Sequence, residues 1–372
     1  MKNTISLILT AIPMLTLISC NKGSASSQNP DFTFSSSVYP VAEDITGSSV
    51  DLPVFLSGAS DEIVTLEYST LDSTAVEGEN YVAVSSGKLT FNPGETAKSI
   101  NITILHDTTN KQDVYFKVAL SNPVNAVLKK SSMTVKVLNV DYTTLAWSDE
   151  FTGTDLNTSW WNYEQGNNNG WGNNELEVYT NKIENVHLDT GYLHITALSP
   201  SNGSYTSGRL TTQGKKEFTY GKITIRAKLP VGQGIWPALW MLGGNISSVS
   251  WPKCGEIDIM EYLGHQSNKV YGTLHWDENG HKYLGGNMTL STGTFSSDFH
   301  LFTLVWTPSR FTWLVDNQEY YELDRLAVSN FPFDLPEFFI FNVAVGGNWP
   351  GPPNETTVFP QHMIVDYIRV YQ

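Results

Sequence analysis

The chain has 372 residues, enough for two domains at about 150 residues each. Hydrophobic residues make up 40% and aromatic residues 12%, which is ample for packed cores and excludes wholesale disorder. Lys and Arg number 22 against 37 Asp and Glu, a formal net charge of -15. Such a surface repels phosphate groups, so nucleic acid is excluded as a partner and a neutral partner fits best.

The N-terminus has the pattern of an export signal. Lys2 precedes the uncharged apolar stretch 5–18, which is shorter than the ~20 residues of a membrane span and typical of a signal-peptide core. It ends in Leu-Ile-Ser-Cys at 17–20, which resembles the bacterial lipobox. We therefore predict a lipoprotein signal peptide over 1–20, a lipid on Cys20 and a membrane-anchored protein of the bacterial cell envelope. An ordinary signal peptide with an incidental cysteine is the alternative.

A small-residue segment leads into the first domain. Residues 21–30 (NKGSASSQNP) predict a flexible tether. Over 31–141, short alternating runs such as Val50–Phe55 are separated by Gly, Asp, Asn and Pro, the pattern of a β-sandwich. All 11 tryptophans lie at or after Trp147, which places a domain boundary just before it.

Three stretches of this first domain are similar to a Calx-beta module: Tyr39–Asp44, Asp72–Tyr81 and Gly87–Thr96. Such modules commonly bind calcium through clustered carboxylates. Here Asn80 stands where an Asp is usual, and fewer hard oxygen ligands weaken calcium binding. We interpret the domain as a spacer or adhesion module.

The second domain, 142–372, is strand-like throughout. Runs such as Tyr220–Leu229 and Met363–Tyr371 alternate, and no window sustains the helical spacing i, i+3, i+4, i+7 over three turns. We predict an all-β protein, in which the Calx-beta-like sandwich is followed by a concanavalin-like β-jelly roll. The curved sheet of a jelly roll can hold a polymer on its concave face.

The chemistry is concentrated in the stretch 255–262, Gly-Glu-Ile-Asp-Ile-Met-Glu-Tyr. Side chains of a strand alternate between faces, so Glu256 and Asp258 point the same way and Glu261 is out of phase. One β-bulge near Ile259–Met260 would return Glu261 to the acidic face, and bulges are frequent beside active sites. Three acids would then line one cleft.

Crowded carboxylates cannot all ionise, so the pKa of at least one rises. Glycoside hydrolysis needs this combination of one ionised carboxylate and one protonated acid. Acids on a half-exposed strand give the same short pattern, so the surrounding residues decide. The eight histidines show no metal-ligand spacing and no Gly-rich loop opens a helix, so we expect no cofactor in catalysis. Cys254 is predicted to be a buried core thiol.

The surrounding segments resemble the laminarinase-like branch of glycoside hydrolase family 16, over essentially all of the second domain. They are GWGNNELEVYT (170–180), SGRLTT (207–212), YGK (220–222), GIWPALWMLG (234–243), the acid stretch, GTLHW (272–276), VAVGGNWPG (343–351) and VDYIRVY (365–371). One departure is Glu177-Val178, where related laminarinases often carry Gln-Tyr.

The resemblance implies a retaining endo-glycosidase that hydrolyses β-1,3-glucan of laminarin type through a covalent glycosyl-enzyme. Glu256 would be the nucleophile, Asp258 its assisting carboxylate and Glu261 the acid/base. A mixed-linkage β-glucanase or a galactanase of the same family stays open, as does a non-catalytic surface glycan-binding protein. The intact set of three acids favours an enzyme.

The same segments imply further site residues. Those expected to bind the glucan are Asn174, Glu175, Arg209, Trp236, Trp240, His275, Trp276 and Trp349. Tryptophans are expected here because sugars present apolar C–H faces that aromatic rings cover. The resemblance also implies a structural calcium site made by Glu150, the Gly191 carbonyl and Asp366.

Overall fold

The computed structural model describes residues 29–372 except 35–36, 44–47, 108–112, 139–141 and 202. The predicted signal peptide 1–20, the lipidation site Cys20 and all but the end of the tether 21–30 lie outside the described residues. Within the described part of the chain, no helix is both long and apolar enough to cross a membrane.

The first domain is a β-sandwich, as predicted. One of its sheets has the order β6-β3-β1-β8, and the other contains β2-β9-β7-β4-β5. A shared core fills the space between them, and within it the rings of Tyr81 and Phe116 stack at 4.1 Å. The strands are β1 Asp31–Phe34, β2 Val38–Ala42, β3 Ser48–Leu56, β4 Val64–Asp72, β5 Gly87–Phe91, β6 Ala97–Ile104, β7 Val114–Val124, β8 Val127–Leu128 and β9 Ser132–Leu138.

The second domain is a larger sandwich with two short helices. Its strands are β10 Leu145–Asp149, β11 Asn162–Tyr163, β12 Glu177–Tyr179, β13 Val186–Asp189, β14 Tyr192–Ser201, β15 Ser204–Ser207, β16 Arg209–Thr211, β17 Glu217–Phe218, β18 Gly221–Lys228, β19 Ile235–Gly243, β20 Glu256–Tyr262, β21 Lys269–Asp277, β22 His281–Thr289, β23 His300–Trp306, β24 Arg310–Val315, β25 Gln318–Asp324, β26 Glu337–Val345 and β27 Gln361–Tyr371. The helices are α1 Ile246–Val249 and the 3₁₀ turn η1 Arg325–Ala327.

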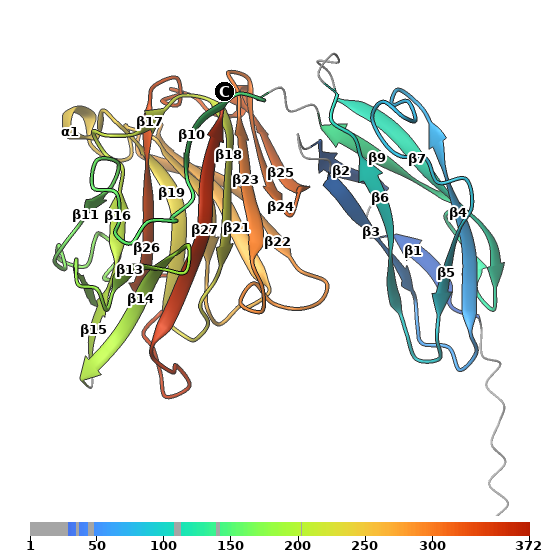
Figure 1. Ribbon diagram of the computed structural model, residues 1–372, viewed down its shortest axis with the longest axis horizontal. Helices are drawn as coiled ribbons and strands as arrows, with labels where there is room; N and C mark the ends of the chain where they lie inside the picture. The colour runs from blue at the N-terminus through green and yellow to red at the C-terminus, as the bar shows by residue number, and fades with distance from the viewer. Residues whose placement is uncertain (1–28, 35–36, 44–47, 108–112, 139–141, 202) are drawn as a thin grey trace, which may run out of the picture.

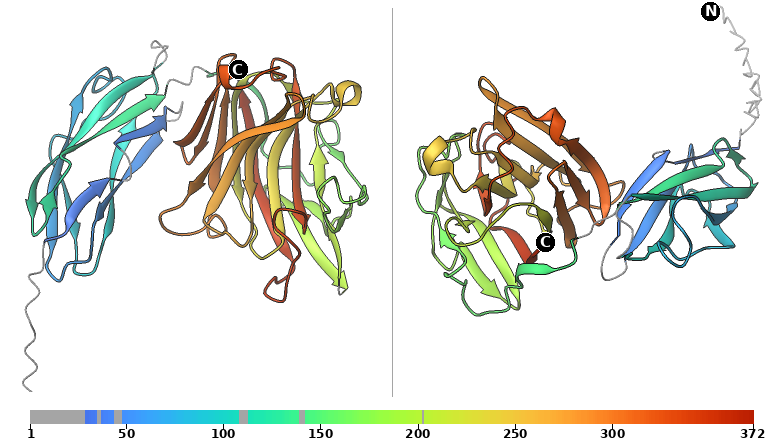
Figure 2. Two further views of the ribbon diagram at one scale, coloured as in Figure 1. Left: turned by 180° about the vertical axis from the view of Figure 1, so that it is seen from behind. Right: turned by 90° about the horizontal axis from the view of Figure 1, so that it is seen from above.

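Two curved layers make up this second domain, and Figure 2 shows them stacked face to face. One layer is an eight-stranded sheet with the order β11-β16-β26-β19-β20-β21-β22, and its eighth strand, β17, pairs with β26. The other runs β12-β15-β14-β27-β18-β23-β24-β25. Fully buried aromatic rings, among them Trp161, Trp306 and Trp313, fill the core between the layers. The predicted all-β jelly roll is confirmed.

The two domains meet along one strand edge. Strand β25, the last of its layer, lies antiparallel to β2 of the first domain, with Val41 opposite Gln318. Hydrogen bonding therefore continues from one domain into the other as a 15-stranded sheet (Figure 1). The interpretation of the first domain as a spacer did not anticipate this contact.

Candidate active site

The acid strand β20 carries the predicted bulge. Asp258 and Met260 pair with consecutive residues of β19, so the intervening Ile259 is an extra residue. The register with β21 also shifts between Asp258 and Glu261. Because the bulge adds one residue, Glu261 returns to the face that carries Glu256, and both side chains are partly exposed there. We call this side of the eight-stranded sheet the acidic face.

Burial and mutual repulsion act on all three acids. Asp258 is 3% exposed, and burial raises its pKa to about 8. Burial first and the Asp258 charge second raise the pKa of Glu256 to about 8, and the same two causes do so for Glu261. The site therefore holds at least one proton at neutral pH, which is the state that two-carboxylate chemistry requires.

Each of the two outer acids accepts a hydrogen bond from an indole. Trp251 Nε1 donates to Glu256 Oε2 at 2.7 Å, and Trp236 Nε1 donates to Glu261 Oε1 at 3.2 Å. A donor that faces a carboxylate favours its charged form and fixes its rotamer. The tryptophans that border the acids thus also orient them.

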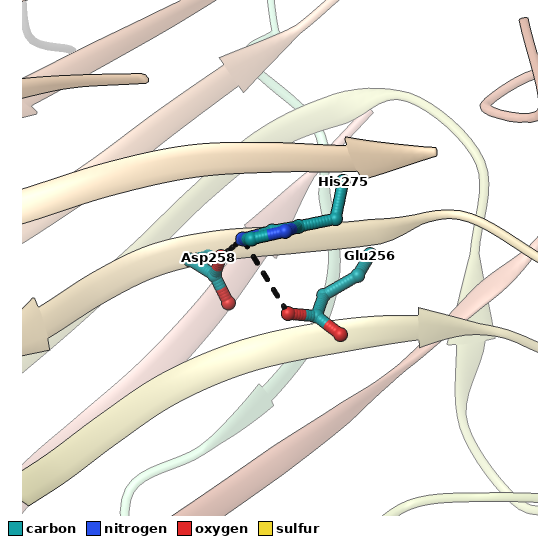
Figure 3. A group of neighbouring side chains, drawn as sticks. All are labelled: Glu256, Asp258 and His275. Atoms are coloured by element: carbon teal, nitrogen blue, oxygen red, sulfur yellow. Dashed lines mark ion pairs between the residues drawn. The ribbon is translucent and has the colours of Figure 1, made fainter. Parts of the chain in front are cut away.

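A histidine faces the acids from β21. His275 Nε2 lies 3.2 Å from Asp258 Oδ2 and 3.7 Å from Glu256 Oε1 (Figure 3). Its other ring nitrogen lies 2.8 Å from His281 Nε2, and the two imidazoles stack at 5.0 Å. Among the described residues, His275 and the two acids form the one cluster of His, Cys, Asp and Glu that could hold a metal.

Three of the predicted tryptophans lie together near the acids. Trp236 and Trp240 are partly exposed on the same side of β19, because they are four residues apart in a strand. Trp349 is 42% exposed, and its ring meets Trp236 edge-on at 5.6 Å. It also contacts Tyr271 at 5.0 Å. These rings form an aromatic surface beside Glu261.

The prediction that Trp276 binds the substrate is wrong. Its side chain is 3% exposed and belongs to the core between the two layers. Strand β21 alternates regularly, so its neighbour His275 faces the acids while Trp276 points the opposite way. Two adjacent residues of a regular strand cannot both reach the acidic face.

Arg209 and Glu175 are placed behind the aromatic surface rather than on it. They are 8% and 7% exposed, which leaves little area for direct contact with a sugar. The Arg209 guanidinium lies 4.5 Å from the Trp171 ring and 5.0 Å from the Trp240 ring, and it pairs with Glu164. Arg209 thereby supports Trp240 from below.

Asn174 is exposed and ties two loops together. Its side-chain amide donates to Asn348 Oδ1 at 2.8 Å, next to Trp349. Nearby Glu177, at the departure from the usual Gln-Tyr pair, is fully buried and accepts a 2.6 Å hydrogen bond from the Val345 amide. Both contacts hold the segment that carries Trp349.

Sequence reasoning missed Trp251, His281 and Tyr283. Trp251 and Tyr283 are 45% and 66% exposed, and the His281 ring lies 4.6 Å from Trp251 and 5.8 Å from Tyr283. Two signals were available in the sequence. Trp251 precedes Glu256 by only five residues, and His281 and Tyr283 share a strand face by their spacing of two.

The carboxylates predicted to bind calcium contact arginines. Glu150 accepts two hydrogen bonds of 2.9 Å from Arg369, and Asp366 pairs with Arg226. A cation would have to compete with both guanidinium groups for these oxygens. Calcium binding by Glu150, Gly191 and Asp366 stays a prediction.

A fourth acid lies close behind the nucleophile candidate. Glu337 is fully buried, and neither carboxyl oxygen has a hydrogen-bond partner among the described residues. Burial raises its pKa well above the usual range, and the charges of Glu256 and Asp258 raise it further. Cys254 is also fully buried, as predicted, and burial raises the pKa of its thiol to about 12.

Glu337→Gln should stabilise the protein in a pH-dependent way. A carboxyl whose pKa is raised on folding stabilises the native state below its unfolded pKa of about 4.3 and loses that contribution as the pH rises. Glutamine has no such proton to lose. In thermal unfolding from pH 4 to pH 9, the Tm of the variant should therefore increasingly exceed that of the wild type.

Glu355→Gln, a change at an exposed acid, is the matched control and should leave the pH profile of the Tm as it is. A constant Tm difference between Glu337→Gln and wild type over the whole range would contradict a protonated Glu337.

Known proteins are similar to this chain in sequence and in fold. Residues 150–369 match the family Glycosyl hydrolases family 16, and residues 26–141 match the Calx-beta domain. The glucan endo-1,3-beta-glucosidase A1 of Niallia circulans is 41% identical over 259 residues, and the beta-glucanase of Rhodothermus marinus is 41% identical over 245. Each alignment covers 61% of this chain, but 38% of the first relative and 85% of the second.

A solved structure agrees with these relatives. The laminarinase catalytic domain from Thermotoga maritima MSB8 superimposes with a TM-score of 0.57 at 48% sequence identity. The superposition covers 62% of this chain and 98% of that domain. The family match extends over more than half of the chain and contains the acid strand. The chain therefore belongs to glycosyl hydrolase family 16, with a Calx-beta domain before its family 16 domain.

Proposed function

We propose that the chain is an endo-β-1,3-glucanase of laminarin type that works with retention of the anomeric configuration. The observation that carries this proposal is the bulged strand β20, which turns Glu256 and Glu261 to one face with Asp258 between them. Relatives that are named as β-1,3-glucan hydrolases support the choice of substrate.

In this mechanism Glu256 attacks the anomeric carbon and forms the glycosyl-enzyme, while Glu261 gives its proton to the departing glycosidic oxygen. Glu261 then takes a proton from the water that releases the sugar. His275 lies within ion-pair distance of Glu256 and thereby favours ionised Glu256 as the nucleophile. Asp258 is almost fully buried between Glu256 and Glu261. By binding or releasing a proton, Asp258 lowers or raises the repulsion that acts on the carboxylates of Glu256 and Glu261.

Substrate recognition rests on aromatic stacking with a neutral polymer. The rings of Trp236, Trp240 and Trp349 offer apolar surface to the C–H faces of glucose units. A net charge of -15 suits an uncharged glucan and disfavours sulfated chains. Mixed-linkage glucan and galactan remain to be tested beside laminarin, since loop shape decides linkage.

We place this enzyme in the bacterial cell envelope, anchored to the membrane by lipid on Cys20. The support is the sequence 17–20, Leu-Ile-Ser-Cys, after an uncharged apolar stretch. An anchored hydrolase would cut polymer close to the cell that takes up the fragments.

Exchange of either catalytic acid should separate their roles. Glu256→Ser should abolish laminarin hydrolysis but leave laminarin binding intact, because only the covalent step is lost. Glu261→Ala should slow hydrolysis by about 10²–10⁴, and an activated aryl leaving group or added azide should restore part of the rate. NMR of the first product should show the β anomer.

Glu355→Ala is the control for these variants, since the side chain is exposed, and it should keep full activity. An α anomer as first product would contradict retention, and an active Glu256→Ser would contradict its role as nucleophile. Hydrolysis of galactan or mixed-linkage glucan in preference to laminarin would change the substrate.

Replacing Trp349 should affect substrate binding, whereas replacing Trp276 should affect protein stability. Trp349→Ala removes an exposed ring, so KM for laminarin should rise by about fivefold, equivalent to ~1 kcal/mol, with an unchanged Tm. Trp276→Ala empties a core position and should destabilise the protein by about 3–5 kcal/mol. Equal Tm losses in both variants would contradict the exposed placement of Trp349.

Cys20→Ser should release the protein from the membrane. In a bacterial host that lipidates exported proteins, the wild type should fractionate with membranes and carry an acyl mass. The variant should appear in the soluble fraction with the same specific activity on laminarin. Membrane retention of the variant, together with no acyl mass in the wild type, would contradict the anchor.

A further inference from the structure

The contact between the two domains is built from complementary charges. Arg310 of the catalytic domain donates through both terminal nitrogens to the two oxygens of Asp113 in the first domain, each at 3.3 Å. Lys136 of the first domain lies 3.2 Å from Asp113 and 3.6 Å from Glu322 of the catalytic domain. Arg310 also lies 3.4 Å from Glu322. Positive and negative groups from both domains thus alternate around one cluster.

This cluster differs from an ordinary surface ion pair. The side chains of Asp113 and Lys136 are only 14% and 17% exposed, and those of Arg310 and Glu322 about a third. Exposed pairs contribute little because water screens them, whereas partly buried charges lose much more when a partner is removed. Glu319 is half-buried near Lys136, and burial raises its pKa. The cluster therefore needs both domains to be in place.

Apolar and backbone contacts extend the interface. Leu138 at the end of the first domain packs with Val305 and Leu314 of the catalytic domain. Tyr142 joins this group, and its hydroxyl donates to the Trp306 carbonyl at 3.1 Å. The apolar group and the β2–β25 pairing thus add to the charge cluster at the boundary between the domains.

Strand β25 connects the interface to the acid strand. Glu319 lies beside the charges of the first domain, whereas its neighbour Tyr320 extends into the sandwich. The Tyr320 hydroxyl lies directly against Gly272 of β21, because a Cβ atom added to this glycine would be only 2.5 Å from it. Burial raises the pKa of Tyr320, and the charges of Asp258 and Glu261 raise it further.

We propose that the Calx-beta domain is a fixed structural partner of the catalytic domain, docked in cis on the edge of β25 by the charge cluster of Asp113, Lys136, Arg310 and Glu322. Docking pairs Gln318, the first residue of the edge strand β25, with Val41, so this end of the edge is no longer open to a second copy of the chain.

A designed disulfide tests this docking without relying on activity. Directly opposite residues in an antiparallel pair have Cα atoms about 4.5–5.5 Å apart, within the range that a disulfide bridges. Val41→Cys with Gln318→Cys, in a Cys20→Ser background, should therefore oxidise to an intramolecular cross-link in the full chain. Non-reducing electrophoresis and peptide mass mapping would show a monomer that contains the linked peptides.

Thr33→Cys with Gln318→Cys is the matched control, because Thr33 lies exposed on the other sheet of the first domain and should not cross-link. Absence of the Val41–Gln318 cross-link, with folded protein, would overturn the docking. A cross-link found only in dimers would overturn docking in cis and show that the domain pairs with a second chain.

Hydrogen exchange tests the charge cluster with a milder change. Asp113→Asn removes one charge shared by Arg310 and Lys136, so amide exchange over 318–324 should become at least several-fold faster than in the wild type. Asp51→Asn, on the other sheet of the first domain, should leave that exchange unchanged. Equal exchange in Asp113→Asn and wild type would overturn the cluster as the group that holds the domains together. A failure of the glucanase assignment would change none of these readouts.

Discussion

The site depends on one extra residue in one strand. Without the bulge at Ile259, regular alternation would send Glu261 into the core, where a second carboxyl could not meet a substrate. With it, Glu256 and Glu261 share the acidic face, and the neighbouring hydrophobic residues still fill the sandwich. On this face the indole of Trp236 donates to Glu261 and the indole of Trp251 donates to Glu256.

Burial raises the pKa values of these acids, so that protons stay bound near neutral pH. Burial also makes a charge in this region unfavourable for the stability of the folded protein. Asp258, Glu337 and Cys254 are all at most 3% exposed around the nucleophile candidate, so charge there is costly unless protons remain bound. The imidazole of His275, together with the two indoles, compensates part of that cost.

Much of the fold and of the candidate site was predictable from the sequence, because alternation along a strand determines which face of the sheet each side chain occupies. The all-β fold and the bulge follow from alternation and its interruption. Trp276 was predicted to bind substrate because it belongs to the same family segment, 272–276, as His275. Adjacent residues of a strand face opposite ways, so only His275 faces the acids. The β2–β25 contact could not be foreseen, since it joins Val41 to Gln318 across the whole chain and leaves no local signal.

The proposed mechanism depends most directly on Glu256 as the covalent nucleophile. The most direct measurement is to trap the glycosyl-enzyme with a 2-fluoro glucoside that carries an activated leaving group, and to map the labelled peptide by mass spectrometry. The account predicts one added sugar per chain, located on Glu256 and absent from Glu256→Ser. A label on Glu261 or Asp258 would contradict it, and so would turnover of natural substrate with no covalent adduct.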